Sequence, residues 1–363
     1  MQRIILTTGG TGGHIFPALA VAEELRSRYP NCRILFIGGE HGPEKELATR
    51  AGLEFASLPV RGILGRGWKS LPALLAMGKG LLQCFRLLRS FAPQAVVGFG
   101  GYAGFLPVLL ASWKKIPCAV HEQNKLPGVT NKILGRRADR VFLTYPDQEG
   151  LFQADRVRLT GNPVRRSLLG IRDTEKHYVH NTGGHLLILG GSQGARAIND
   201  QVLKALPYFK SIGLKLLHIT GRADLDRVHQ AYAEQGCDPE QAVAFQEDMA
   251  QAYAWADLVV CRAGASTLAE LTVVGRPSIL IPFPYATHGH QLDNARYLER
   301  QGAAIVLEQS YLQDICLGSV VSDLLLLPKK LQQMGQAARS LGKPGAGTAI
   351  VEEIQSMLPG QQG

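Results

Sequence analysis

Residues 3–17 read RIILTTGGTGGHIFP, and this stretch decides the fold. A run of Ile and Leu leads into four glycines and then into Pro17, which is typical of a strand, a tight loop and the first turn of a helix. Glycine backbone can approach a phosphate closely, and the positive end of a helix favours its negative charge. The stretch therefore predicts a βα unit that binds a phosphate or a diphosphate.

The same pattern returns in the second half of the chain, where Leu-Ile-Leu at 187–189 leads into Gly-Gly-Ser-Gln-Gly at 190–194. Short runs of Ile, Val and Leu alternate with segments of helical spacing in both halves. We expect strands at 3–8, 33–37, 95–99, 117–120, 140–143 and 157–159, and again at 185–189, 214–220, 242–245, 257–261, 277–281 and 303–307. The pattern predicts an α/β protein with two Rossmann-like domains, whose parallel sheets face each other across a cleft.

A polar, turn-rich stretch marks the boundary between the two series of strands. We expect an N-terminal domain at 1–162, a linker at 163–184, a C-terminal domain at 185–345, and a final helix and tail at 346–363 that could pack on either domain. Two domains also suit a chain of 363 residues.

The net charge of +9 comes almost entirely from one region. Residues 55–121 hold eight Lys and Arg and no Asp or Glu: Arg61, Arg66, Lys69, Lys79, Arg86, Arg89, Lys114 and Lys115. Apolar side chains lie among them: Ile63, Leu64, Trp68, Leu71, Leu74, Leu75, Met77, Leu81, Leu82 and Phe85. This mixture favours docking on an anionic membrane leaflet over binding to nucleic acid, with a buried helix that has a solvated basic rim as the alternative.

The six cysteines show no CxxC pair and no zinc spacing, so we expect reduced thiols and no metal site. The first residues lack the pattern of a signal peptide, and no apolar run is long enough to span a bilayer. These features favour a cytoplasmic location.

Polar motifs follow several of the expected strands, where open parallel sheets bind their ligands. Glycines crowd residues 98–104, and His14 could act as a general base or only hydrogen-bond a phosphate. His121-Glu122-Gln123-Asn124 suits either function or turn formation. Glu270, at the end of the segment Cys261–Glu270, could hold ribose hydroxyls, or it could be a carboxylate near a helix N-terminus that the helix dipole stabilises.

Glycine loops of this kind also occur in other enzyme classes. The dinucleotide pattern GxGxxG would need Gly or Ala at position 15, where Ile15 stands, which weakens the case for a nicotinamide-dependent oxidoreductase. A sugar-nucleotide epimerase and a catalytically silent nucleotide-binding scaffold remain as alternatives.

The motifs together resemble the MurG family of peptidoglycan glycosyltransferases. The resemblance runs from residue 1 to about 345 and rests on 9–14, 100–102, 121–124, 161–165, 190–196 and 261–270. It implies the two-domain GT-B fold and inverting transfer of GlcNAc from UDP-GlcNAc to the C4 hydroxyl of MurNAc in lipid I. That hexosyltransferase reaction makes lipid II for peptidoglycan synthesis, and so serves cell-wall biogenesis, cell shape, cell division and the cell cycle.

The resemblance also implies roles for individual residues. His14 would be the catalytic base, and the acceptor diphosphate would meet Gly10, Gly100, Gly101 and Tyr102. The donor would contact Thr11, Gly12, Gly13, Asn124, Arg165, Ser192, Gln246, Ala265, Ser266, Thr267, Leu268, Ala269, Glu270, His290 and Gln291. Gln246 stands where the family commonly has an apolar residue that contacts uracil through its backbone.

The expected partners are UDP-GlcNAc, lipid I, anionic inner-leaflet lipids and the cell-wall synthesis machinery, with no nucleic acid. The resemblance implies a peripheral protein on the cytoplasmic face of the bacterial inner membrane. The reaction that the resemblance implies requires no cofactor in the site, and a divalent cation would at most stimulate it.

Overall fold

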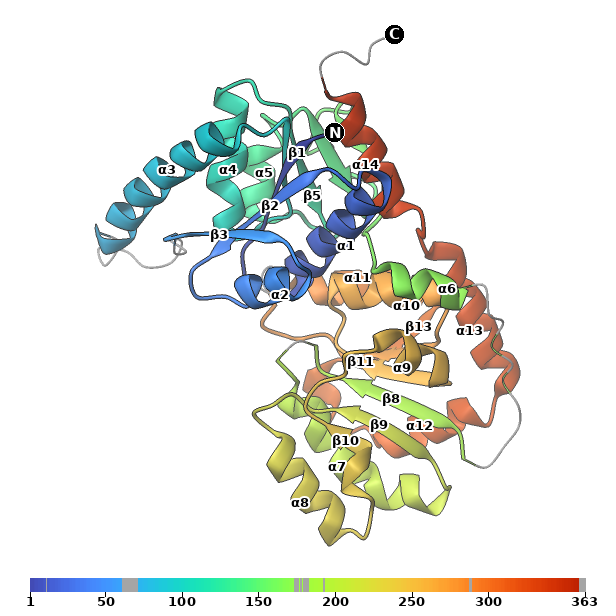
Figure 1. Ribbon diagram of the computed structural model, residues 1–363. Helices are drawn as coiled ribbons and strands as arrows, with labels where there is room; N and C mark the ends of the chain where they lie inside the picture. Colours follow the sequence, from blue (N-terminus) through green and yellow to red (C-terminus); the bar gives the residue numbers. More distant parts are fainter. Residues whose placement is uncertain are drawn as a thin grey trace. The chain divides into compact units, whose positions relative to one another are not determined.

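The computed structural model describes residues 1–10, 12–60, 71–172, 176, 178, 183–191, 193–286 and 289–358, and for residues 71–77 it describes the helix without the side chains (Figure 1). The chain forms two compact units. Unit 1 comprises Met1–Arg166 and Lys343–Gly363, and unit 2 comprises Ser167–Gly342.

Unit 1 is built on a parallel sheet with the strand order β3-β2-β1-β4-β5-β6-β7 among the described residues. Its strands are β1 (Arg3–Thr7), β2 (Arg33–Gly39), β3 (Glu54–Leu58), β4 (Ala95–Gly98), β5 (Cys118–Glu122), β6 (Arg140–Leu143) and β7 (Val157–Arg158). Its helices are α1 (Gly12–Arg28), α2 (Glu44–Arg50), α3 (Leu71–Phe91), α4 (Gly101–Trp113), α5 (Val129–Leu134) and α14 (Ala346–Ser356). The order reverses between β1 and β4, where the register pairs Thr7 with Gly98. Ligands of such sheets bind at this switch point.

Helices cover both faces of this sheet. Ile4, Leu6 and Phe36 pack with residues of α1 and α14 on one face, and Ile5 and Val96 pack with residues of α3 and α4 on the other. Successive residues of a strand point to opposite faces of the sheet. Because helices cover both faces, all of these side chains are buried.

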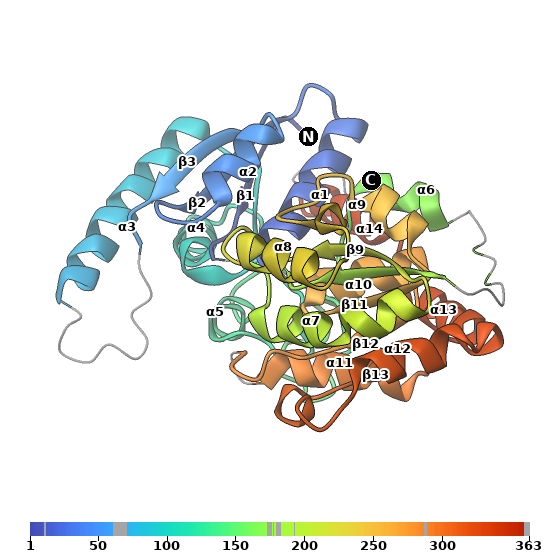
Figure 2. The same cartoon turned by 90° about the horizontal axis from the view of Figure 1, so that it is seen from below.

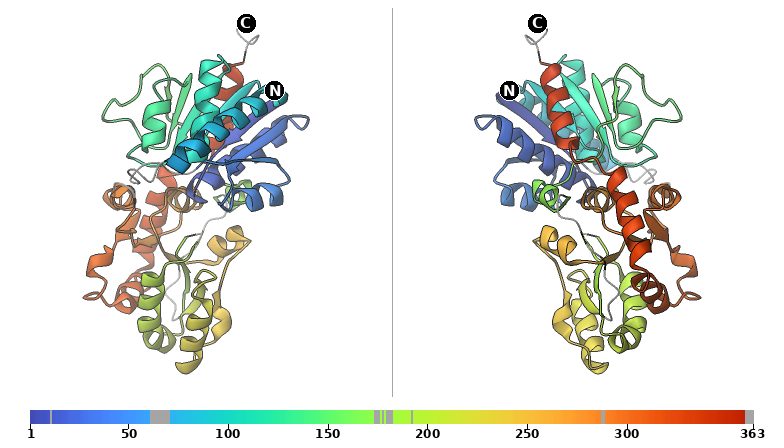
Figure 3. Two further views of the ribbon diagram at one scale, coloured as in Figure 1. Left: turned by 90° about the vertical axis from the view of Figure 1, so that its left-hand side faces the viewer. Right: turned by 90° about the vertical axis from the view of Figure 1, so that its right-hand side faces the viewer.

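Helix α14 returns from the end of the chain to unit 1, where it lies along α1 (Figure 3). Glu353 accepts hydrogen bonds from Arg140 and Arg158, each at 3.0 Å, so α14 is joined to β6 and β7. Arg28 of α1 forms an ion pair with Glu352 at 3.0 Å. The final helix therefore belongs to the first unit.

Unit 2 repeats the architecture with the strand order β10-β9-β8-β11-β12-β13 among its described residues. Its strands are β8 (His185–Leu189), β9 (Lys215–Ile219), β10 (Ala242–Val243), β11 (Leu258–Cys261), β12 (Ser278–Leu280) and β13 (Ala304–Val306). Its helices include α6 (Leu169–Arg172), α7 (Arg196–Ser211), α8 (Leu225–Glu234), α9 (Met249–Trp255), α10 (Ala265–Val274), α11 (His290–Arg300), α12 (Leu317–Leu325) and α13 (Pro328–Leu341). Figure 2 shows α7 and α8 beside its sheet. The order reverses between β8 and β11, with Leu189 paired to Cys261.

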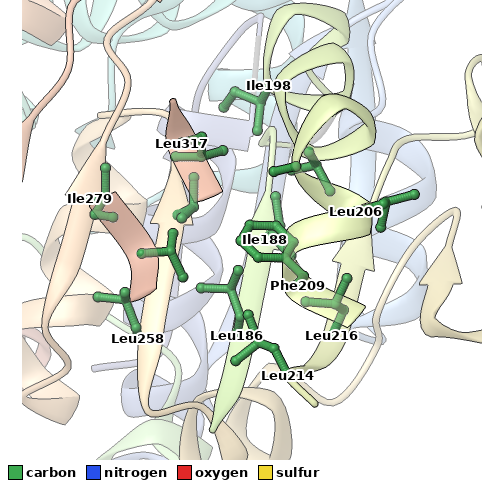
Figure 4. Packing of buried hydrophobic residues seen from close by; sticks show 14 of the residues in the cluster. Leu186, Ile188, Ile198, Leu206, Phe209, Leu214, Leu216, Leu258, Ile279 and Leu317 are labelled. Carbon is green, nitrogen blue, oxygen red and sulfur yellow. The ribbon is translucent and has the colours of Figure 1, made fainter. Parts of the chain in front are cut away.

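The core of unit 2 lies between this sheet and its helices (Figure 4). Leu186 and Ile188 of β8 are fully buried against Ile198, Leu206 and Phe209 of α7. This packing holds the loop between β8 and α7 at the carboxyl edge of the sheet.

The structure confirms the predicted strands and adds β3, which the sequence analysis missed. The prediction that the first helix begins near Pro17 is wrong, because α1 begins at Gly12 and has Pro17 inside it. The expected linker at 163–184 contains a 3-10 turn at Arg166–Leu168 and the short helix α6. None of the helices in the described part of the chain is long and apolar enough to cross a membrane.

Candidate functional site

Two glycine loops meet at the switch point of unit 1. The Gly9 N–H donates to the Gly100 carbonyl at 3.1 Å. A Cβ on Gly101 would lie 1.8 Å from the Gly9 carbonyl oxygen, and Gly101 has φ +77°. Both the close approach and the backbone conformation therefore require glycine. The β1–α1 and β4–α4 loops thus form one backbone surface.

His14 lies on this surface, in the first turn of α1. A Cβ on Gly100 would lie 2.8 Å from His14 Cδ2, so the imidazole rests directly on the second glycine loop. Tyr102 follows and is half-exposed. The structure therefore brings His14, Gly100 and Gly101 together, whereas Thr11 lies outside the described residues.

A buried network lies next to His14 at the end of β5. His121 Nε2 donates to the Gly161 carbonyl at 3.0 Å, which leaves Nδ1 to accept from Gln123 Nε2 at 3.0 Å. Burial, together with the nearby His14, lowers the pKa of His121 to about 4. His121 is therefore neutral near pH 7 and already holds both of its ring nitrogens in hydrogen bonds, so it is poorly suited to act as a base.

Glu122 organises the loop that follows β5. Its Oε1 accepts from the backbone N–H and the side-chain amide of Asn124, and its Oε2 accepts from the Gly128 N–H and from Asn131 Nδ2, at 2.9 to 3.2 Å. Four donors to one buried carboxylate fix the loop and the start of α5. Within the motif at 121–124, Glu122 thus holds Asn124 and the loop, while His121 bonds to Gly161 and Gln123.

Arg165 lies after β7, in the segment that leaves unit 1. Its guanidinium carbon is 4.8 Å from the centre of the Phe16 ring on α1. A cation over an aromatic face is held in a defined position. This contact places the Arg165 charge on the flank of α1, a few residues beyond His14.

The third glycine loop, Gly190–Gly194, occupies the switch point of unit 2. A Cβ on Gly194 would lie 2.1 Å from the Thr220 carbonyl oxygen, and Gly194 has φ +75°. The loop therefore packs against the end of β9 before α7 begins at Arg196. Ser192 lies outside the described residues.

A second buried network joins α7, which follows this loop, to the end of β9. Asn199 of α7 donates to the Thr220 carbonyl at 3.1 Å and to Asp224 at 2.7 Å, and its Oδ1 accepts from His218 Nε2 at 3.0 Å. His218 Nδ1 then accepts from the Tyr232 hydroxyl. Burial lowers the pKa of His218 to about 3, so the neutral ring serves the network.

Glu270 is a buried carboxylate on α10, behind the second loop of this switch point. The Tyr253 hydroxyl on α9 donates to its Oε2 at 2.9 Å. Helix α10 begins at Ala265 directly after Gly264, which has no side chain to cap it. The backbone N–H groups of Ala265, Ser266 and Thr267 thus lie in the first turn at the carboxyl edge of the sheet, and Leu268 and Ala269 follow them in the helix.

Two loops complete the carboxyl edge of unit 2. Gln291 of α11 accepts from the Phe283 N–H at 2.9 Å, and His290 precedes it as the first residue of that helix. The side chain of Gln246 donates to the Asp248 carbonyl at 3.2 Å within the loop before α9. These glutamines are therefore placed by local hydrogen bonds.

Three polar residues of these sites were missed by the sequence analysis. Glu44 accepts from the Gly10 N–H at 2.8 Å, and Asn199 of α7 donates to the Thr220 carbonyl, on which the third glycine loop packs. Arg262, which is buried, donates to the Ile281 and Pro282 carbonyls and to Gln309, and burial lowers its pKa to about 10. Each contacts backbone far away in sequence, so its role could not be read from neighbouring residues, although Arg262 itself stands within the motif at 261–270.

An exposed apolar and basic surface lies on unit 1. It is formed by Lys79, Leu81, Leu82, Phe85, Arg86 and Arg89 of α3 with Trp113, Lys114 and Lys115 at the end of α4. We call it the α3–α4 surface. The Lys114 ammonium lies 4.2 Å from the centre of the Phe85 ring. Arg61, Arg66, Lys69, Ile63, Leu64 and Trp68 fall outside the described residues.

Across the described residues, no three His, Cys, Asp or Glu side chains gather in a way that could hold a metal ion.

Comparisons with known proteins cover both units. A family described as glycosyltransferase family 28 N-terminal domain matches residues 4–143, and the family 28 C-terminal domain matches residues 185–348. The chain is 49% identical over 376 residues to the UDP-N-acetylglucosamine--N-acetylmuramyl-(pentapeptide) pyrophosphoryl-undecaprenol N-acetylglucosamine transferase of Nitratidesulfovibrio vulgaris (strain DSM 19637 / Miyazaki F), covering 99% of this chain and 98% of that protein. It is 50% identical over 365 residues to the protein of the same description from Solidesulfovibrio magneticus, covering 98% of each.

Solved structures show the same fold. The crystal structure of Acinetobacter baumannii MurG matches with a TM-score of 0.74 at 30% identity, covering 98% of this chain and 100% of that chain. The UDP-GlcNAc 2-epimerase of Neisseria meningitidis matches with a TM-score of 0.65 at 15% identity, covering 98% of this chain and 100% of that one, and shares the fold alone.

Proposed function

The chain belongs to the MurG family of glycosyltransferase family 28, and from this membership we propose that it transfers GlcNAc from UDP-GlcNAc to the C4 hydroxyl of MurNAc in undecaprenyl-pyrophosphoryl-MurNAc-pentapeptide, lipid I. The product is lipid II, the precursor used in peptidoglycan synthesis. The observation that carries this proposal is an identity of 49% over 99% of the chain to a transferase of that description. A GT-B fold with a glycine loop at the switch point of each unit agrees with it.

The donor is proposed to bind unit 2 at the carboxyl edge of its sheet. Glu270 would accept the two ribose hydroxyls, since Tyr253 already holds one of its oxygens in place. The diphosphate would meet the amides of Gly190–Gly194 and Ser192, and the first turn of α10 from Ala265 to Ala269. Gln246 would contact uracil through its backbone, and His290 and Gln291 would contact the sugar.

The family motifs also assign donor contacts to residues of unit 1, namely Thr11, Gly12, Gly13, Asn124 and Arg165. Amide N–H groups and one guanidinium would stabilise the charge that grows on the departing diphosphate. This arrangement requires no cofactor, and a divalent cation would at most stimulate the reaction.

The acceptor is proposed to lie on the two glycine loops of unit 1. Gly10, Gly100, Gly101 and Tyr102 would line the place of its diphosphate. His14 would take the proton of the C4 hydroxyl as that oxygen bonds to the anomeric carbon of GlcNAc. The anomeric C–O bond to UDP breaks on the opposite face, and UDP leaves with the electron pair, so the configuration is inverted.

The α3–α4 surface is proposed to dock the protein on the cytoplasmic leaflet that holds lipid I. Its exposed apolar side chains would enter the interface, and its five cations would attract anionic lipid. The protein would then act peripherally at the inner membrane, alongside the cell-wall synthesis machinery, and would not bind nucleic acid.

One assay tests the proposed reaction. Radiolabelled UDP-GlcNAc and lipid I, or a short-chain analogue, should yield a labelled disaccharide lipid with no dependence on NAD(P). Each of three other outcomes would refute the proposal. Epimerised sugar nucleotide would favour the epimerase, turnover that depends on NAD(P) would favour the oxidoreductase, and no turnover at all would favour the scaffold.

A further inference from the structure

Glu44 is a buried carboxylate that the proposed mechanism does not use. It is the first residue of α2, and only 1% of it is exposed. Its Oε1 accepts from the Gly10 N–H at 2.8 Å, and its Oε2 is buried with no hydrogen-bond partner among the residues that the structure describes. Burying a carboxylate with one oxygen unsatisfied costs stability, so the packing around it must hold it in place.

Two glycines provide the space that this carboxylate occupies. A Cβ on Gly38 would lie 2.6 Å from Glu44 Cβ, and a Cβ on Gly42 would lie 1.7 Å from Glu44 Oε2. Neither position leaves room for a larger residue while Glu44 keeps its place. The backbone of the β2–α2 connection is thus shaped around a side chain that reaches the first glycine loop.

The hydrogen bond from Gly10 fixes the peptide group between Gly9 and Gly10. The N–H of that peptide donates to Glu44, and its carbonyl oxygen, that of Gly9, packs on Gly101. Gly10 has φ +105°, a conformation that favours glycine, and glycine has more backbone freedom than other residues, so an added contact restricts this loop. Glu44 therefore holds the first loop in the orientation in which it meets the second.

We propose that Glu44 is a positioning residue for the transfer reaction: through the Gly10 amide it locks the two glycine loops together and so fixes His14 on Gly100. This inference rests on the proposed function for its catalytic consequence. The Gly10 amide is committed to Glu44, so Gly10 contributes to the acceptor site through its backbone shape. A misplacement of about 1 Å at a reacting group can lower the rate by about 100-fold.

The test compares four single variants with the wild-type chain. Glu44→Ala removes the acceptor of the Gly10 N–H, and Glu44→Gln keeps an acceptor of the same shape. Glu46→Ala is the matched control on α2, because Glu46 is exposed and forms an ion pair with Arg50 at 2.9 Å on the surface of that helix. Gly42→Ala adds a Cβ in the space of Glu44 Oε2, so it displaces the Glu44 carboxylate from Gly10 while Glu44 itself stays unchanged.

Three measurements follow each variant: hydrogen–deuterium exchange of the peptide covering residues 9–16, kcat with lipid I, and UDP affinity by calorimetry. For Glu44→Ala and Gly42→Ala we expect exchange at least about tenfold faster and kcat about 10- to 100-fold lower. UDP affinity should fall by a smaller factor than kcat, because Glu270, the proposed ribose partner, lies in unit 2, and only Thr11, Gly12 and Gly13 of the first loop are proposed donor contacts. Glu44→Gln and Glu46→Ala should match the wild type in all three.

A double variant separates positioning from a general loss of stability. If Glu44 acts through His14, then His14→Ala with Glu44→Ala should be no slower than His14→Ala alone. Multiplied losses would overturn the proposal, as would unchanged exchange and kcat in Glu44→Ala, or a Glu44→Gln variant as impaired as Glu44→Ala. A wild-type chain that makes no disaccharide lipid would refute the proposed function, while the exchange data would still decide whether Glu44 holds the loop.

Discussion

Replacing Leu82 and Phe85 with serine should release the protein from anionic membranes. Both side chains belong to the α3–α4 surface, where Leu82 is 53% exposed and Phe85 is 40% exposed. Lys114 lies over the Phe85 ring, so the double variant also removes the apolar partner of one cation. The cations themselves remain, which separates the apolar contribution from the electrostatic one.

The expected size of the effect follows from the exposed fractions. Burying a whole Leu or Phe side chain contributes about 1.5–3 kcal/mol, so the roughly half that is still exposed contributes about 1 kcal/mol for each residue. Together they give about 2 kcal/mol, which corresponds to a partition coefficient lower by about 30-fold.

Vesicle flotation measures this coefficient with neutral and with anionic lipid. Leu326→Ser is the matched control, because Leu326 is 50% exposed but lies at the end of α12 in unit 2. Wild type should bind anionic vesicles in preference to neutral ones, and added salt should weaken that binding. Equal binding of wild type to both lipids, binding to neither, or a double variant that partitions like wild type would refute the reasoning.

Three further expectations concern the two sites. His14→Ala should lower kcat by about 10²- to 10⁴-fold with little change in the KM for UDP-GlcNAc, and near-normal kcat in steady-state kinetics would contradict the base assignment. Glu270→Ala should weaken UDP binding in calorimetry, and an unchanged UDP affinity would contradict the ribose role. Its neighbour matters for stability: Tyr253→Phe should lower the free energy of unfolding in urea by about 1.5–3 kcal/mol, because it loses the hydrogen bond to a buried carboxylate. Burial lowers the pKa of His121 to about 4, while an imidazole of the unfolded chain titrates near 6.5, so the unfolded state binds more protons between these values. The free energy of unfolding of unit 1 should therefore fall by about 2 kcal/mol from pH 7.5 to pH 5, and His121→Gln should flatten this dependence.

The strands were predictable because most of them are buried on both faces and read as continuous apolar runs. Strand β3 was missed because it is the edge strand of its sheet, and its sequence, Glu-Phe-Ala-Ser-Leu, is only partly buried. The start of α1 was misplaced because Pro17 fits a first turn, whereas the glycines at 12 and 13 do not favour helix. In the folded protein the packing of Ile15 and Ala18 in the core outweighs that propensity.

The glycine loops could be found from the sequence because each directly follows an apolar strand. Their contacts with each other could not, since the pairing of Gly9 with Gly100 depends on β1 and β4 being neighbours in the sheet. Glu44 was missed for a related reason. Its neighbours in sequence are typical of a surface helix, and only the close approach of Gly38 and Gly42 reveals a buried carboxylate.

The return of α14 to unit 1 has a consequence for biosynthesis. Ribosomes make this helix after all of unit 2, yet its Ile350, Val351 and Ile354 complete the core that contains Ile4 and Leu6 of the first strand. Unit 2 is thus inserted in the sequence of unit 1, and it is synthesised completely before the last helix of unit 1 exists. A premature stop codon shortly before residue 346 would therefore damage the half of the protein that is translated first.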